Sequence, residues 1–329
     1  ALLLLTAHGS FLVSRARATL RRWLIVTAVS VAVLGLHLMH AFGQREQVSW
    51  ATRPHLYDLT GVYISAFGTK LLPPLVGLVT VVVLGALTWA LIAAPDSSIW
   101  AVTGAVAVAA AAGVAFVALE RRLVRPMVPL GLFASRVFAA ANAMTFLVYG
   151  ALGAVLFLLV LQLQVAARWS ALAAGLVGLP VTIAMMLLSS RTAGLSQRIG
   201  PRIPMSLGPL ICAVGVTALL AVGREATWVA VLPGIVVFPL GLSLLVSPLT
   251  ATVLAEAPDR YAGIASGIND AVARAGSLLA VAAIPAVAGL SGAAYRDPVT
   301  MTAGYRTAMV LCALLLAAGG VVSWIGLRG

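Results

Sequence analysis

Charged residues make up only 9% of this 329-residue chain, and hydrophobic residues make up 62%. A water-soluble domain carries about 25% charged residues, so the composition excludes an ordinary soluble protein and predicts an integral membrane protein. The net charge is +12, but the arginines are spread thinly between apolar segments. This spacing argues against nucleic acid as a partner and favours the lipid bilayer.

Residues 1–70 differ in composition from the rest of the chain. They hold all four histidines and the only lysine, Lys70. A charge-free run at 23–44 predicts one membrane helix, whereas 45–70 is polar and has no clear helical period. His37 and His40 would share a helix face, but no third ligand accompanies them. A polar face is therefore favoured over a metal site, and we expect no metal and no cofactor.

Eight further charge-free runs follow, and each is about as long as the ~20 residues that an α-helix needs to cross hydrocarbon. A transmembrane β-barrel would instead show short segments that alternate between apolar and polar residues. The sequence therefore predicts an all-α, polytopic helical membrane protein. The runs span 71–95, 97–119, 137–167, 169–190, 203–223, 226–255, 275–295 and 307–327.

The arginines between these runs predict the orientation of the chain. From residue 96 onward, alternate breaks hold ten arginines, and the breaks between them hold four. Cytoplasmic loops of membrane proteins carry the excess of basic residues. We therefore expect the breaks near 120–136, 191–202 and 256–262, together with the C-terminus, to be cytoplasmic.

Several short motifs follow one another in a recognisable order. They are the linker "ERRLVRPMVPLGLFASR", then "ANAMTFLVYGAL", "LQLQ", "GLSQRIGPR", "VSPLTATVL" and "AGIASGINDAVARAG". Over about 74–327, this ordered set resembles the fourteen-helix drug:proton antiporters of the major facilitator superfamily. The resemblance implies a partial major-facilitator fold: two linker transmembrane helices at 71–119, a cytoplasmic basic linker at 120–136, and a C-terminal six-helix bundle at 137–329.

The resemblance also implies a function. The family exports small, drug-like amphipathic compounds across the plasma membrane in exchange for protons. Residues 1–70 match nothing in the family's N-terminal half, so we expect an atypical front segment and a chain that lacks the N-terminal transporter half. A non-transporting half-transporter or partner subunit therefore stays open as an alternative.

An integral membrane enzyme is the third class that we weighed. The chain has no G-x-S-x-G nucleophile motif and no H-E-x-x-H zinc motif. Its nine acidic residues are scattered, with no two at metal-binding spacing. We expect no catalytic residue and no enzymatic activity.

Asp270 and Arg274 lie four residues apart in an otherwise apolar stretch. On a helix they share one face, with the acid on the N-terminal side, which is the favourable order. The family pattern leads us to expect asparagine at position 270, so Asp270 departs from it while Asn269 matches. One hypothesis is a gating or coupling pair at the cytoplasmic mouth. The alternative is a neutralised structural pair that packs this helix.

Asn142, Thr145 and Tyr149 recur at helical spacing and predict one polar stripe. Together with Asn269 they are our candidates for a substrate cavity, with hydrogen bonds between helices as the alternative.

The motif "GLSQRIGPR" places Gly194, Arg198, Gly200 and Arg202 in a predicted cytoplasmic loop. It resembles a degenerate copy of the superfamily's loop motif, which implies a conformational latch. Because the acidic residue of that motif is missing, simple anchoring by positive charge is the favoured alternative.

Overall fold

The structure is a computed structural model that describes residues 72–93, 98–122, 126 and 128–328. These residues all belong to one compact unit, 67–329, and among them every regular element is a helix. Predictions that fall on 1–70, including the helix at 23–44 and the histidine pair, lie outside the described residues.

Seven helical segments are long and apolar enough to cross a membrane, and α4 adds a shorter apolar segment, Val79–Ile92. This confirms the predicted all-α, multi-pass membrane class. The long helices are α4 (Leu72–Ala93), α5 (Ile99–Arg122), α6 (Arg136–Leu161), α8 (Leu179–Ile199), α9 (Arg202–Ala218), α10 (Trp228–Ala255), α11 (Ala262–Val287) and α12 (Pro298–Gly326). Short elements are α7 (Ala171–Leu176), η2 (Leu130–Ala134), η3 (Gln162–Ala166), η4 (Leu219–Ala221), η5 (Asp259–Tyr261) and η6 (Gly292–Tyr295).

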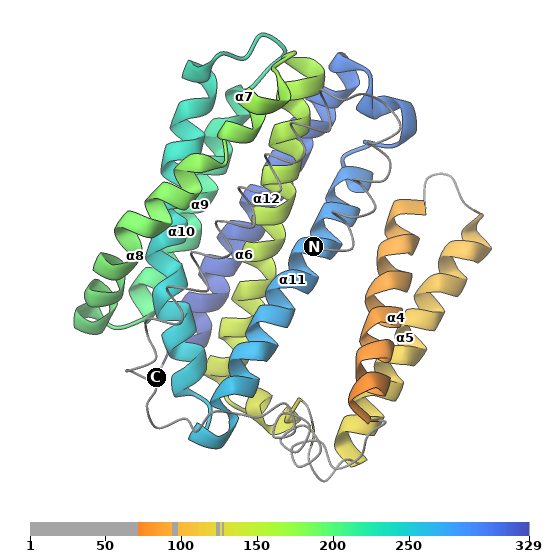
Figure 1. The fold of residues 1–329 in the computed structure, drawn as a ribbon, viewed down its shortest axis with the longest axis vertical. Helices are drawn as coiled ribbons and strands as arrows, with labels where there is room; N and C mark the ends of the chain where they lie inside the picture. The colour runs from red at the N-terminus through yellow and green to blue at the C-terminus, as the bar shows by residue number, and fades with distance from the viewer. Residues whose placement is uncertain (1–71, 94–97, 123–125, 127, 329) are drawn as a thin grey trace, which may run out of the picture. The chain divides into compact units, whose positions relative to one another are not determined.

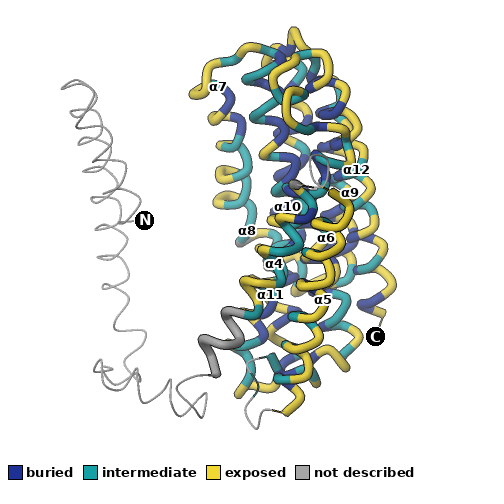
Figure 2. Tube along the Cα trace, turned by 90° about the vertical axis from the view of Figure 1, so that its right-hand side faces the viewer, coloured by how far each residue is buried: buried dark blue, intermediate teal, exposed yellow. Residues whose placement is uncertain are grey.

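Helix α6 is central to the packing, and it contacts α10, α11 and α12 (Figure 1). Helices α8 and α9 pack on α10, and α9 also packs on α12. Buried positions gather on α6, α10 and α12, whereas α5 buries only Ala109 and Glu120 among its described side chains (Figure 2). The α4–α5 hairpin packs on the other helices chiefly through α4 against α11.

Two predicted runs begin later than the helices that contain them. The run at 275–295 corresponds to α11, which begins at Ala262, and the run at 307–327 corresponds to α12, which begins at Pro298. Both helices therefore include charged residues that our charge-free criterion excluded. A helix tolerates charge where its face does not meet lipid, so absence of charge is too strict a test for helix limits.

The predicted run at 169–190 matches one candidate membrane span, Ala171–Ser189, but it is not one continuous helix. It is divided into α7 and α8 near Gly178, and Pro180 lies in the first turn of α8, where a missing N–H costs no hydrogen bond. Helix α8 then continues to Ile199, so Gly194 and Arg198 lie on this helix and not in a loop.

One end of the helices is held together by hydrogen bonds from side chains that begin α6 and α9. Arg136 donates to the carbonyl of Ile325 at 3.2 Å, and Arg202 donates to the carbonyl of Trp324 at 3.2 Å. The Arg202 guanidinium also lies 3.8 Å from the centre of the Trp324 ring. Cations at a helix C-terminus satisfy its last carbonyl groups and its dipole, so the end of α12 is anchored to two other helices.

At the opposite end, α6 finishes in the single π-helical turn η3, which begins at Gln162. The fully buried Gln162 amide donates to the Thr302 hydroxyl at 3.0 Å and to the Val222 carbonyl at 3.5 Å. Nearby, Tyr305 donates to the carbonyl of Leu219 at 3.1 Å. These bonds tie the ends of α6 and α9 to the start of α12.

Two glycines allow α6 and α11 to approach closely. A Cβ atom added at Gly276 would lie 2.5 Å from the backbone oxygen of Phe146, and one added at Gly150 would lie 3.2 Å from the Gly276 oxygen. Small residues at a crossing let membrane helices pack backbone against backbone. The α6–α11 contact therefore depends on the absence of a side chain at position 276.

Gly276→Ala is expected to lower the thermal stability of the purified protein, because the added methyl group must push the two backbones apart. Overpacking of this kind costs about 1–3 kcal/mol. The control is Gly267→Ala on the same helix, where an added Cβ would meet no atom within 4 Å. Equal melting temperatures for the two variants would contradict the close crossing.

Candidate functional site

A polar cavity of about 370 Å³ lies between α6, α10 and α11. Polar side chains from all three helices line it, whereas another cavity that contacts α6 and α11 is apolar. The polar cavity is lined by Tyr149, Thr250, Val253, Leu254, Ser266, Gly267, Asn269, Asp270 and Ala273.

One stripe of α11 is both polar and exposed. It consists of Ser266, Gly267, Asp270 and Arg274. The first two lie four and three residues before Asp270 and Arg274 lies four residues after it, so they share one face of the helix. We call these four residues the α11 stripe. Ionised side chains are costly in hydrocarbon, so this face is suited to water or to another protein segment and not to lipid.

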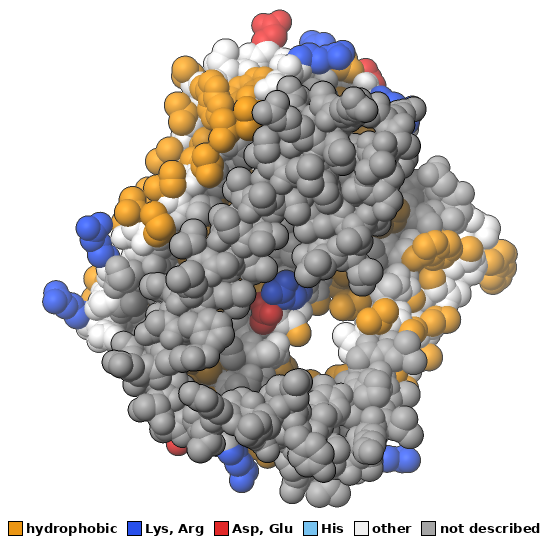
Figure 3. All heavy atoms as spheres, in the orientation of Figure 1, with side chains coloured by type: hydrophobic (Ala, Val, Ile, Leu, Met, Phe, Trp, Pro, Cys, Tyr) orange, Lys and Arg blue, Asp and Glu red, His pale blue; other side chains and the backbone are white. Residues whose placement is uncertain are grey.

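The two charges of the stripe form the ion pair that the sequence predicted. Arg274 Nε lies 3.0 Å from Asp270 Oδ2, and the two side chains are 79% and 65% exposed. Figure 3 shows an acidic and a basic side chain side by side near the middle of the visible face, while most other visible charged side chains lie toward its edges. The geometry of the pair is thus established, and its role in gating or coupling stays a prediction.

The predicted polar stripe on α6 is divided between two environments. Tyr149 lines the polar cavity, whereas Asn142 and Thr145 lie behind it, 3% and 0% exposed. Asn269 of α11 lines the polar cavity and also contacts the buried pair, because its amide donates to Thr145 Oγ1 at 2.8 Å and to Asn142 Oδ1 at 3.2 Å. In the structure, Asn142 and Thr145 of α6 therefore make hydrogen bonds to α11, which is the alternative to a cavity lining that the sequence left open.

The buried pair is also satisfied on its own helix. Asn142 donates to the carbonyl of Phe138 and Thr145 donates to the carbonyl of Ala141, at 2.9 and 2.8 Å. Because its amide points into this network, Asn269 holds α11 in one rotation against α6. That rotation places the next residue, Asp270, at the cavity.

Two polar residues of the cavity wall were missed from the sequence, Thr250 of α10 and Ser266 of α11. Ser266 lies four residues before Asp270, so extending the Asp270–Arg274 spacing backward would have found it. Thr250 belongs to the motif "VSPLTATVL", but hydroxyl side chains can bond to their own helix, and Thr250 does so with the Val246 carbonyl. Its position on the cavity depends on how α10 packs against the other helices, which the local sequence does not reveal.

The four residues of the predicted loop motif lie elsewhere. Gly194 and Arg198 are exposed on α8, and Gly200 follows α8 with a φ of +79°, a conformation that favours glycine. Arg202 begins α9 and contacts Trp324. None of them lines the polar cavity, and the predicted latch stays a prediction.

Helices α8 and α10 are joined by hydroxyl groups. Thr192 donates to the Ser243 carbonyl at 2.9 Å, and Ser247 donates to the Ser189 carbonyl at 3.1 Å. Within the described part of the chain, no three His, Cys, Asp or Glu residues are grouped so as to hold a metal ion.

Arg274→Ala is expected to destabilise the protein in lipid nanodiscs more than Asp270→Asn does. The first change leaves the short Asp270 side chain as an unpaired carboxylate, whereas the second leaves an unpaired guanidinium on a long side chain that can extend its charge toward water. Thermal unfolding of both variants measures the difference. The double variant provides the control and should regain stability over Arg274→Ala, and equal stability of the two single variants would contradict the pairing.

Comparison with known proteins identifies relatives along 213 residues of the chain. Over that length it is 30% identical to the quinolone resistance protein NorB of Staphylococcus aureus strains JH9 and JH1, and the match covers 64% of this chain and 44% of each relative. NorB of strain Newman matches over the same extent. The chain thus spans less than half the length of these relatives, and no protein-family model matches it.

Proposed function

We propose that the chain is the C-terminal part of a membrane transporter that exports drug-like amphipathic compounds. The observation that carries the proposal is the α11 stripe, a polar and exposed helix face beside a polar cavity. A membrane protein needs such a face only where water or a second protein surface replaces lipid. The similarity to NorB, which is named for quinolone resistance, supports drug export as the activity.

We also propose, from the motifs described above, that the chain belongs to the fourteen-helix antiporters of the major facilitator superfamily. Helices α4 and α5 then correspond to the family's two linker helices, and α6 to α12 correspond to its C-terminal bundle. The α11 stripe would face an N-terminal transporter half across a central, water-filled path. Substrate held between two halves is exposed to alternate sides as they rock.

The orientation follows from the arginines. Arg121, Arg122, Arg136, Arg198 and Arg202 all lie at the ends of helices on the side where α6 begins and α12 ends. By the positive-inside rule this side, with the C-terminus, would face the cytoplasm of a plasma membrane. The polar cavity is nearer to this side, because Asp270 is eight residues, or about 12 Å, from the start of α11.

Each polar residue of the cavity has a proposed role. Asp270 attracts a cationic group of the substrate, or a proton, and Arg274 holds the carboxylate when neither is bound. Tyr149, Asn269 and the hydroxyls of Thr250 and Ser266 supply neutral hydrogen bonds. We propose no enzymatic activity for this cavity.

The test is export of a fluorescent quinolone from an efflux-deficient bacterium that produces the chain, alone or together with an N-terminal transporter half, with membrane insertion verified. The chain alone should insert without exporting, because the substrate is held between two halves, whereas the two halves together should export, and this export should stop when a protonophore collapses the proton gradient. Insertion of both halves without export would overturn the proposed transport and support the alternative, a non-transporting half or partner subunit. Export that persists without the gradient would overturn proton coupling.

Asp270→Asn is expected to reduce export of cationic compounds about tenfold, the effect of losing roughly 1.4 kcal/mol, and to affect neutral compounds less. The matched control is Asp259→Asn, the same chemical change at an exposed acid outside the polar cavity. Equal export by both variants would show that the cavity carboxylate takes no part.

A further inference from the structure

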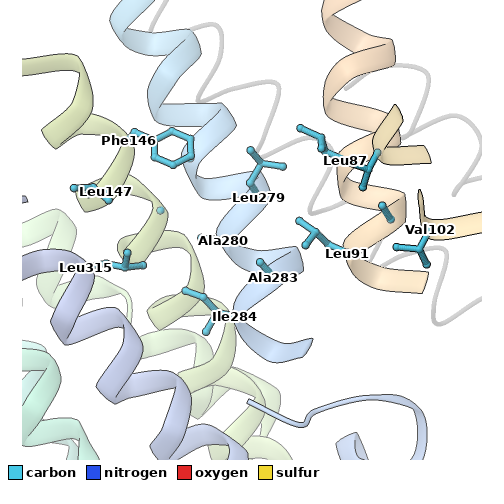
Figure 4. Close-up of a pocket in the computed structure, with 14 residues that line it drawn as sticks. Leu87, Leu91, Val102, Phe146, Leu147, Leu279, Ala280, Ala283, Ile284 and Leu315 are labelled. Atoms are coloured by element: carbon cyan, nitrogen blue, oxygen red, sulfur yellow. The ribbon is translucent and has the colours of Figure 1, made fainter. Parts of the chain in front are cut away.

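A second cavity, which we call the lateral groove, lies beside the α4–α11 contact, between the α4–α5 hairpin and helices α6, α11 and α12. It has a volume of about 470 Å³, and its walls come from α4, α5, α6, α11 and α12. Figure 4 shows Leu87 and Leu91 of α4 opposite Phe146, Leu279 and Ala283, with the space between them. The groove is distinct from the polar cavity, since the two share no lining residue.

The groove exists because small residues face α4. Gly276, Ala280 and Ala283 of α11 line it, together with Gly150 of α6. The two glycines are needed for the α6–α11 crossing, so they cannot carry side chains that would fill the space. Atoms that border an empty space lose their dispersion contacts, and the groove is therefore stabilised by an occupant.

The lining specifies the chemistry of that occupant. All 14 lining residues are apolar or glycine. Sites for drug-like molecules of about 300–1,000 Å³ carry a few polar groups that fix the orientation of the ligand, and none lines this groove. A hydrocarbon chain needs no such group, and lipid chains surround the apolar helices α4 and α5.

Hydroxyl groups lie on the other side of the α4–α11 contact. A cavity of about 330 Å³ there is lined by Thr88, Ser291 and Tyr295 among apolar side chains. The Thr88 hydroxyl is buried and has no hydrogen-bond partner among the described residues. A buried donor without a partner is costly, and the ester oxygens of a phospholipid are acceptors that could satisfy it.

We infer that a membrane phospholipid binds along the α4–α11 contact, with an acyl chain in the lateral groove and its ester region near Thr88. The lipid fills the space between the hairpin and the other helices and so fastens α4 and α5 to them. This site is independent of the proposed transport activity.

The test is native mass spectrometry of the purified full chain with added dioleoyl phosphatidylglycerol. Ala283→Trp fills the groove and should lower lipid occupancy about tenfold, a change equivalent to roughly 1.4 kcal/mol. Ala318→Trp, at an exposed position of α12 outside both cavities, should retain wild-type occupancy. Equal occupancy in the two variants would overturn the site.

A second measurement uses the unaltered protein, in case Ala283→Trp does not fold. A phospholipid with a photoreactive acyl chain should label peptides of α4 and α11 above the level on α9, and uniform labelling would overturn the site. Thr88→Val should weaken phospholipid binding and leave binding of free oleic acid unchanged. If oleic acid binds to the wild type and phospholipid does not, the occupant is a fatty acid and the ester contact is wrong.

Discussion

The structure depends on one constraint, that a polar group within hydrocarbon must find its partner inside the protein. At one end, Arg136 and Arg202 satisfy the last carbonyls of α12, and at the other the Gln162 amide joins three helices. Between these ends the same requirement selects Asn142, Thr145 and Asn269 as a network between α6 and α11. Polar side chains therefore determine which helices pair, while apolar side chains fill the remaining space.

Close packing and the polar cavity are consequences of the same helix pair. Gly276 brings the α11 backbone against α6, and Asn269 fixes the rotation of α11 at that contact. Successive residues on a helix differ in direction by about 100°, so Asp270 necessarily leaves this interface and reaches the cavity. The candidate site is thus positioned in part by residues that do not line it, such as Gly276, Asn142 and Thr145, and substitutions behind the cavity should alter its geometry.

Much of the fold could be predicted from the sequence, because apolar runs of membrane length leave few alternatives to a helix. The run at 226–255 nearly coincides with α10. The prediction of helix limits was poorer for α11 and α12, because charged residues within these helices interrupted the charge-free runs. The Asp270–Arg274 pair was predictable because it is local. The partner of Asn142 and Thr145 was not, since Asn269 is more than 120 residues away, and periodicity contains no information on contacts between helices.

The attachment of the α4–α5 hairpin has a consequence for synthesis of the chain. Its main partner, α11, follows only after the segment 123–261. Membrane helices insert first and associate afterwards, and a growing chain folds from its N-terminal side. The hairpin must therefore persist in the bilayer as an independent pair while five further helices, α6 to α10, are made. The high apolarity and the few buried positions of the hairpin suit contact with lipid during that interval.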